Sequence, residues 1–257
     1  MGKITAVANQ KGGVGKTTTA INITASLAAA EKRVLLIDTD PQGNSTSGLG
    51  LDKDNLEGSL YDLYTGSKTL DEIIKETSLP FLNIIPSNIE LIGAELELTG
   101  KDHRETILKN ALEPVKHRYD YIFIDCPPSL SLLTLNALVA ADSLLVPMQC
   151  EYYALEGISM LLRTFNLIKD SYNPALEIEG IVLTMFDGRN SLANQVSDEL
   201  RKHFGDKVYR TIIPRNITLA EAPSHGKPVI LYDIRSKGAQ SYLELAKEIM
   251  ENEARVG

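Results

Sequence analysis

The stretch NQKGGVGKTTTAI, residues 9–21, decides the fold of this chain. It overlaps the end of an apolar, strand-like segment at residues 3–9 and leads into a helical apolar spacing over residues 17–30. The glycines at positions 12, 13 and 15 allow backbone N–H groups to turn inward, because glycine adopts conformations that other residues avoid. A loop of this kind between a strand and a helix is typical of a phosphate-binding loop.

The phosphate loop predicts a set of nucleotide contacts. Lys16 is expected to reach the β- and γ-phosphates of a bound nucleotide, and the Thr17 hydroxyl is expected to bind Mg²⁺. The positive end of the following helix points toward the same phosphates. The predicted nucleotide-binding residues of this loop are Gly12, Gly13, Val14, Gly15, Lys16, Thr17 and Thr18.

The rest of the chain alternates between strand and helix patterns. Strands are expected at residues 3–9, 33–39, 81–87, 119–125, 142–148, 178–186 and 208–214. Helices are expected at residues 17–30, 101–117, 130–141, 153–169, 190–203 and 236–252. Most of the strands are continuously apolar, which suits a parallel sheet covered on both faces. We therefore predict a doubly wound α/β fold with a mostly parallel sheet, forming one domain over residues 1–257 with an irregular insertion at 44–80.

Composition and charge limit the classes of protein to which the chain could belong. Of the 257 residues, 43% are hydrophobic, and no apolar run approaches the roughly 20 residues that a membrane span requires. We expect a soluble cytoplasmic protein without a signal peptide. Cys126 and Cys150 form no CxxC pair, so we expect buried, reduced thiols and no zinc site. The net charge of −8 disfavours nucleic-acid binding unless basic residues gather in a local patch.

Acidic residues end two of the predicted strands. Asp38 and Asp40 follow the strand at 33–39, and Asp125 ends the strand at 119–125. The carboxyl ends of parallel strands form the edge at which open α/β sheets bind their ligands. Asp125 is therefore expected to hold the Mg²⁺ shell, and a carboxylate beside the γ-phosphate can orient the attacking water.

One departure from the general loop pattern is informative. The pattern places glycine at position 10, where this chain has Gln10 followed by Lys11. The sequence KGGVGKTT resembles the deviant phosphate loop of the ParA, MinD and nitrogenase-iron-protein class of ATPases. The resemblance implies that Lys11 crosses a dimer interface to the nucleotide of the other subunit. It also assigns the water-orienting role to Asp40, so the expected catalytic residues are Lys11, Lys16 and Asp40.

Further stretches resemble one branch of this class. They are residues 38–50, 125–138, 149–157, 183–189, 213–216 and 221–228. Together they are similar to the ParA/Soj partition ATPases over essentially the whole chain. The resemblance implies an ATP-bound homodimer, non-specific binding to double-stranded DNA in the nucleoid, and a ParB-type protein that stimulates hydrolysis. It further implies an adenine site near Met185, Pro214 and Asn216.

The resemblance also implies DNA contacts in the last third of the chain. The candidates are Arg189, Arg215, Lys227 and Arg235, with Lys237 nearby. Arg189 matches a position that the family uses for DNA, whereas a second family arginine is replaced here by Thr218. Because non-specific affinity depends on the phosphates neutralised locally, an acidic chain can still bind DNA through a separate basic patch.

Three alternatives share some of these features. A MinD-like membrane-associated positioning ATPase would carry a basic amphipathic tail, but the charged residues of segment 243–257 are mainly acidic. An iron–sulfur carrier would need cluster cysteines facing each other across a dimer. A non-enzymatic scaffold could retain a nucleotide site, but Lys16, Thr17, Asp40 and Asp125 are all present.

Overall fold

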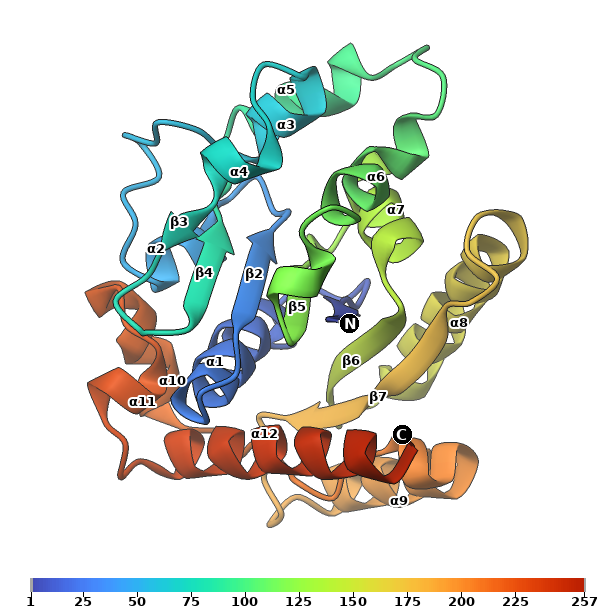
Figure 1. Cartoon of the computed structure of the whole chain (residues 1–257). Coiled ribbons are helices and arrows are strands. Elements are labelled where there is room, and N and C mark those ends of the chain that lie inside the picture. Colours follow the sequence, from blue (N-terminus) through green and yellow to red (C-terminus); the bar gives the residue numbers. More distant parts are fainter. Residues whose placement is uncertain (1, 257) are drawn as a thin grey trace.

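A seven-stranded sheet forms the centre of the computed structural model, which describes residues 2–256 (Figure 1). The strand order is β3-β4-β2-β5-β1-β6-β7, and every pair is parallel except β3 with β4. The strands are β1 (Lys3–Val7), β2 (Val34–Asp38), β3 (Lys75–Glu76), β4 (Leu82–Ile85), β5 (Tyr121–Asp125), β6 (Ser143–Gln149) and β7 (Glu177–Thr184). The predicted doubly wound, mostly parallel sheet is confirmed.

Twelve α-helices lie within the described residues. They are α1 (Lys16–Ala29), α2 (Asn44–Gly48), α3 (Leu60–Thr65), α4 (Leu70–Ile73), α5 (Leu91–Glu97), α6 (Ile107–Leu112), α7 (Leu132–Ala140), α8 (Ala154–Ser171), α9 (Ser191–Phe204), α10 (Ile217–Glu221), α11 (Val229–Tyr232) and α12 (Lys237–Val256). Helices α1 and α12 pack against each other on one face of the sheet, while α5 to α9 contribute to the core on the other. Alternate residues of each central strand enter these two cores, so both faces of the strands are buried as their apolar sequences predict.

Strand β1 lies between β5 and β6, and its position places the phosphate loop at the carboxyl edge of the sheet. Val7, the last residue of β1, pairs with Asp125 at the end of β5, and Asp38 at the end of β2 also pairs with Asp125. Three strand ends therefore bring the loop and two carboxylates together. This is the edge at which open α/β sheets bind ligands.

The irregular segment 44–80 contains α2, α3, α4 and the short strand β3. Strand β3 pairs antiparallel with β4 at the sheet edge. Helices α3 and α4 each begin with a capping box, formed by Ser59 with Asp62 and by Thr69 with Glu72. Such boxes satisfy backbone N–H groups that the first helical turn leaves free, which stabilises helices as short as these.

Two predicted elements are wrong. Residues 208–214 form no strand, although two isolated bridges, Ile181 with Val208 and Phe186 with Pro214, and a few backbone hydrogen bonds join them to β7 and its continuation. The helix predicted over 101–117 is reduced to α6 flanked by two short 3-10 turns at residues 104–106 and 116–118. His103 has a φ of 58°, which a right-handed helix does not accommodate.

Within residues 2–256, none of the helices combines the length and the hydropathy that crossing a membrane would require. Helix α12 turns its apolar side toward the core, where Tyr242, Leu245 and Ile249 are buried. That side is therefore occupied by contacts within the chain.

Candidate nucleotide-binding and hydrolysis site

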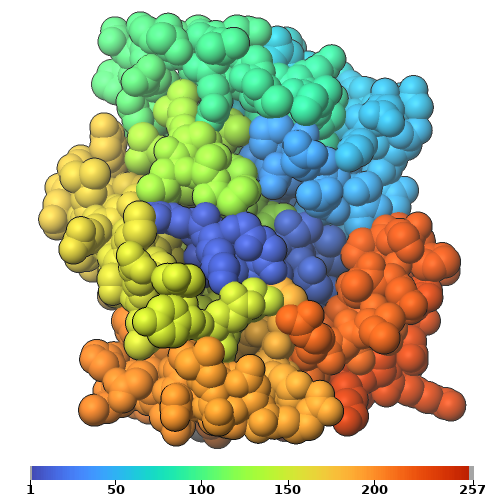
Figure 2. All heavy atoms as spheres, turned by 180° about the vertical axis from the view of Figure 1, so that it is seen from behind, coloured from blue at the N-terminus to red at the C-terminus, as the bar shows by residue number. Residues whose placement is uncertain are grey.

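The phosphate loop has the backbone of an anion cradle. Gly13 has a φ of 72° and Gly15 a φ of 85°, a region that residues with a side chain rarely adopt. A Cβ atom on Gly12 or Gly13 would meet no atom within 4 Å, so the space above these residues is open. Helix α1 begins at Lys16, and its first-turn N–H groups face the same space. Figure 2 shows this N-terminal part of the chain (blue) reaching the surface between several later segments.

Side chains from neighbouring strands hold the loop in place. Asn9 donates its Nδ2 hydrogen to the carbonyl oxygen of Pro147 at 2.8 Å, and its Oδ1 accepts the backbone N–H of Lys11 at 3.0 Å. Thr184 donates its hydroxyl to the carbonyl oxygen of Val14 at 2.8 Å. Sequence reasoning missed both anchors. The available signal was a polar residue at or just after the end of an apolar strand, as in β1 and β7.

Lys16 lies at the floor of the cradle. Lys16 is 7% exposed, and its Nζ donates a hydrogen bond to the carbonyl oxygen of Lys11 at 3.1 Å. Burial lowers the pKa of Lys16, while the nearby carboxylates of Asp125 and Asp40 oppose that effect. A phosphate would supply the negative charge that this buried ammonium group otherwise receives only at a distance.

Asp125 is fully buried at the end of β5. Its Oδ2 accepts the hydroxyl of Ser45 at 2.8 Å, whereas its Oδ1 has no hydrogen-bond partner. Burial, followed by the proximity of Asp38, raises the pKa of Asp125, and the hydroxyls of Ser45 and Thr17 act in the opposite direction. A cation at this position would stabilise the carboxylate.

The oxygen atoms of Asp125 and Thr17 suit a Mg²⁺ ion. The orphaned Oδ1 of Asp125 lies in the same environment as the Thr17 hydroxyl, and both are oxygen donors of the kind that Mg²⁺ prefers. Within the described part of the chain no group of three or more acidic, histidine or cysteine side chains could hold a metal. In proteins, Mg²⁺ commonly takes several of its ligands from phosphate and water. Thr17 and Asp125 therefore fit the role predicted for them.

Asp38 and Asp40 have different surroundings although they are two residues apart. Asp38 is fully buried, and its Oδ2 accepts both the N–H and the hydroxyl of Thr46 at 2.8 Å. It therefore ties α2 to the end of β2. Asp40 is only partly buried, and its Oδ1 accepts the N–H of Gln42 at 2.9 Å. Unlike Asp38, Asp40 is exposed enough to contact a ligand in the open space above the phosphate loop.

Lys11 lies at the mouth of the site. Its Nζ is paired with the carboxylate of Glu151, just before α8, and the side chains of Lys11 and Glu151 are 40% and 51% exposed. The pair lies within one chain. An ion pair this exposed contributes only about 0.2–1 kcal/mol, so Lys11 can leave it at low cost.

Of the predicted adenine residues, Met185 lies beside the loop, whereas Pro214 and Asn216 belong to the segment before α10. Met185 has a φ of 48°, and its Sδ accepts a hydrogen bond from the Gln149 amide at 2.9 Å. A Cβ on Gly15 would lie 3.7 Å from the Met185 methyl group, so this side chain packs against the loop. Pro214 forms a bridge with Phe186, and Asn216 caps α10 by accepting the N–H of Leu219 at 3.3 Å. The structure thus brings Met185 and Pro214 onto adjacent segments.

The four candidate DNA-binding residues are all exposed. Arg189 is 91% exposed along its side chain, and it donates to both carboxylate oxygens of Asp187 at 2.9 and 2.7 Å. Hydrogen bonds from Arg189 lower the pKa of Asp187 to about 2, and Arg215 is close enough to add to this effect. Arg189 and Arg215 are therefore neighbours, whereas Lys227 and Arg235 lie on the α10 to α12 segment.

The two cysteines are free and buried, as predicted. Burial, followed by the charge of Asp125, raises the pKa of the Cys126 thiol, and burial raises the pKa of Cys150 to about 11. Both thiols are thus held in the neutral form.

Fold and site together define a class. A phosphate loop after the central strand, a buried lysine on its helix and carboxylates at the ends of two adjacent strands are the parts of a phosphate-loop ATPase. A family profile described as an AAA domain matches residues 2–178. The chain belongs to the ParA/Soj family of chromosome-partitioning ATPases. It is 58% identical over 252 residues to the sporulation initiation inhibitor protein Soj of Bacillus subtilis, covering 98% of this chain and all of that one. It is 55% identical to the chromosome partitioning protein ParA of Myxococcus xanthus, covering 98% and 89% of the two chains.

Solved structures agree with this assignment. Cobyrinic acid a,c-diamide synthase from Mycobacterium smegmatis, solved with ADP and magnesium, is 38% identical with a TM-score of 0.84, covering 96% of this chain and 93% of that one. The cell division ATPase MinD of Pyrococcus furiosus has a TM-score of 0.79 at 25% identity, covering 98% and 99% of the chains. The predicted family is confirmed, and the MinD alternative matches at lower identity.

Proposed function

We propose that the chain is a single-domain, Mg²⁺-dependent ATPase that turns over slowly and partitions DNA. In this proposal ATP binding produces a homodimer that binds double-stranded DNA without sequence preference. A ParB-type partner then stimulates hydrolysis, and the dimer leaves the nucleoid DNA. Support comes from the relatives named for chromosome partitioning and from a 38% identical structure that holds ADP and magnesium.

In this proposal the chain's own groups bind the triphosphate and place the water. The N–H groups of the loop and the first turn of α1 bind the phosphate oxygens, and the Lys16 ammonium group neutralises the β- and γ-phosphates. Asp40 orients the attacking water from the exposed side of the cradle. Mg²⁺ would neutralise charge that develops on the phosphates, with Thr17 and Asp125 holding its shell. Met185, Pro214 and Asn216 bind the adenine.

The position of Lys11 supports the proposed dimer. The lysine lies at the open mouth of the site, and a weak surface ion pair with Glu151 holds it there. Lys16 of the same chain already supplies a buried cation at the phosphate loop. Lys11 is therefore free to serve a triphosphate presented by a second subunit, and such a charge supplied in trans resembles an arginine finger.

This arrangement makes assembly conditional on ATP. A ligand shifts an equilibrium only by as much as it prefers one state, and here the preference for the dimer would come from the contact between Lys11 and the partner's triphosphate. ADP lacks the γ-phosphate and would offer less to Lys11. The DNA-bound dimer should therefore persist until hydrolysis.

DNA co-sedimentation with ATP, ADP or no nucleotide, at two salt concentrations, tests the proposal. We expect retention only with ATP and a loss of retention at the higher salt, because the contacts are to phosphates. Equal retention with ADP would contradict a nucleotide-controlled DNA-binding state.

A further inference from the structure

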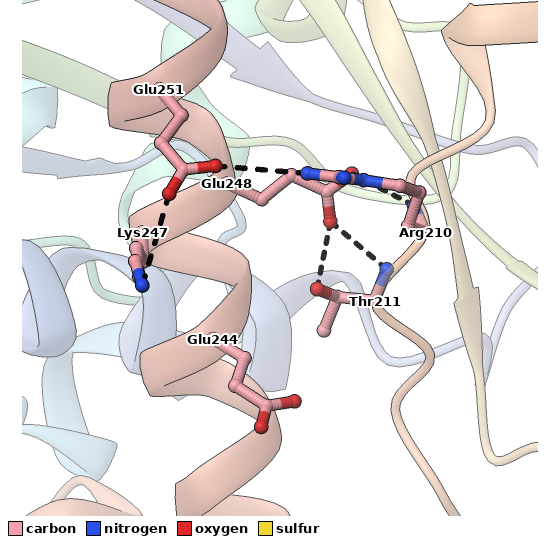
Figure 3. A pocket seen from close by; sticks show the side chains of 6 residues that line it. All are labelled: Arg210, Thr211, Glu244, Lys247, Glu248 and Glu251. Atoms are coloured by element: carbon pink, nitrogen blue, oxygen red, sulfur yellow. Dashed lines mark hydrogen bonds and ion pairs between the residues drawn. The ribbon is translucent and has the colours of Figure 1, made fainter.

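The Glu248 carboxylate of helix α12 accepts hydrogen bonds from Arg210 and Thr211, in the segment that follows α9. Oε1 of Glu248 accepts the backbone N–H of Arg210 at 2.9 Å and its Nε at 3.3 Å. Oε2 accepts the backbone N–H of Thr211 at 2.9 Å and its hydroxyl at 2.7 Å. Figure 3 shows Glu248 reaching from the helix to Arg210 and Thr211 on the neighbouring segment. Four donors from two adjacent residues thus converge on one side chain.

This carboxylate differs from the other acids around it. The Glu248 side chain is 8% exposed, whereas that of Glu251 on the next turn is 42% exposed. Burial by itself raises the pKa of Glu248, but the hydrogen bonds from Arg210 and Thr211 outweigh it and leave that pKa below its usual range. Buried hydrogen bonds to a charged group are stronger than neutral ones, so the contact holds the segment firmly.

The segment that Glu248 holds, Arg210 and Thr211, leads directly to the proposed adenine site. Beyond Thr211, the N–H of Ile213 donates to the carbonyl oxygen of Leu183 at 2.9 Å, and the N–H of Phe186 donates to the carbonyl oxygen of Ile213 at 3.0 Å. Pro214 follows at once and forms the bridge with Phe186. Residues 208–214 form no strand, so Glu248 adds its four hydrogen bonds to the few backbone bonds on the β7 side and to the burial of Tyr209 and Ile213 in the core.

We propose that Glu248 is a positioning residue for the adenine base, acting through Arg210 and Thr211 to hold Pro214 and Asn216 at the distance from the phosphate loop that ATP requires. The inference rests on the proposed nucleotide site. Its physical basis is that adenine recognition depends on groups at fixed positions, and small displacements of such groups reduce binding. Glu248 itself touches no nucleotide in this scheme.

The substitution Glu248→Gln weakens this contact with little change of shape, because only one of the two oxygen acceptors remains. One of its two polar atoms becomes an NH₂ group that cannot accept from the donors of Arg210 or Thr211, so a donor faces a donor. Glu244→Gln is the matched control. Glu244 lines the same surface pocket on α12, and Figure 3 draws no interaction to it. Thr211→Val, which removes only one of the four bonds, serves as a milder second variant.

Binding of MgATP, MgGTP and magnesium tripolyphosphate is measured for each variant by calorimetry. Tripolyphosphate tests the phosphate loop alone, and the comparison with GTP tests recognition of the base. For Glu248→Gln we expect about tenfold weaker binding of ATP, equivalent to about 1.4 kcal/mol, and an ATP preference over GTP reduced by a similar factor. Tripolyphosphate binding should stay the same, Thr211→Val should show a smaller loss in ATP affinity, and Glu244→Gln should match the wild type.

Unchanged ATP affinity in a folded Glu248→Gln variant would overturn the inference. A parallel fall in ATP and tripolyphosphate affinity would do the same, because it would indicate a general loss of structure. If Glu248→Gln does not fold, unchanged ATP affinity in Thr211→Val overturns the inference. Wild-type protein that binds ATP no better than tripolyphosphate would overturn the proposed adenine site as well, so the two failures are distinguishable.

Discussion

Glu151 holds Lys11 inside its own subunit, and removing this carboxylate should promote the ATP-bound dimer. The ion pair is the contact that Lys11 must break before it can reach a triphosphate in a second subunit. The substitution Glu151→Gln keeps the shape of the side chain and removes its charge. The cost of releasing Lys11 then falls in both subunits.

The magnitude follows from the exposure of the pair. Exposed ion pairs contribute about 0.2–1 kcal/mol each, and a symmetric dimer breaks two of them. Dimerisation should therefore be favoured by about 0.4–2 kcal/mol, which lowers the dimer dissociation constant by about 2- to 30-fold. Because salt screens exposed charges, the difference from the wild type should shrink at high ionic strength.

Sedimentation equilibrium with MgATP measures this constant, in an Asp40→Ala background that slows hydrolysis during the run. Glu156→Gln is the control, since Glu156 is also an exposed acid, in the first turn of α8. In a Lys11→Ala background the Glu151→Gln substitution should have no effect. A weaker dimer in Glu151→Gln, or a stronger one that persists without Lys11, would refute the reasoning.

Three further predictions concern hydrolysis, DNA and stability. Asp40→Ala should keep ATP binding and lower the hydrolysis rate by about 100-fold or more, so rapid phosphate release by this variant would contradict its role. Arg189 holds the pKa of Asp187 at about 2, so Asp187 stays ionised near neutrality and a change of pH there does not release Arg189. Asp187→Asn should therefore strengthen DNA binding and steepen its salt dependence, by about 0.9 for each phosphate gained, whereas an unchanged salt slope would place the patch elsewhere. Asn9→Ala leaves the buried carbonyl of Pro147 unpaired and should lower the free energy of unfolding by about 1–3 kcal/mol in urea titrations, and a change within experimental error would mean that the anchor is not needed.

Local sequence predicted those parts of the fold that local chemistry determines. The glycines, Lys16 and the apolar strands carry their own signals, and Asp125 ends a run of five buried strand residues. Parallel strands then bring Val7, Asp38 and Asp125 together because of their register, without any specific side-chain contact.

What could not be predicted depends on partners distant in sequence. The backbone N–H groups of Arg210 and Thr211 bind Glu248, 38 and 37 residues away, and so they are not available for a sheet ladder. An apolar run such as VYRTIIP contains no sign of this competitor. The same holds for the anchors of the phosphate loop, since Asn9 meets the carbonyl of Pro147 only after β6 has paired beside β1. Motifs predicted the candidate reacting groups, and the fold shows which side chains hold their backbone in place.

Mixing two inactive variants tests most directly whether Lys11 acts in the other subunit. Lys11→Ala keeps its own ATP site, and Lys16→Ala keeps the lysine that should reach across. In an equal mixture, half of randomly paired dimers are mixed and each has one complete site, so the ATPase rate should rise to as much as about a quarter of the wild-type rate. A mixture that hydrolyses ATP no faster than the two variants do separately would contradict the account, because Lys11 would then serve only its own nucleotide.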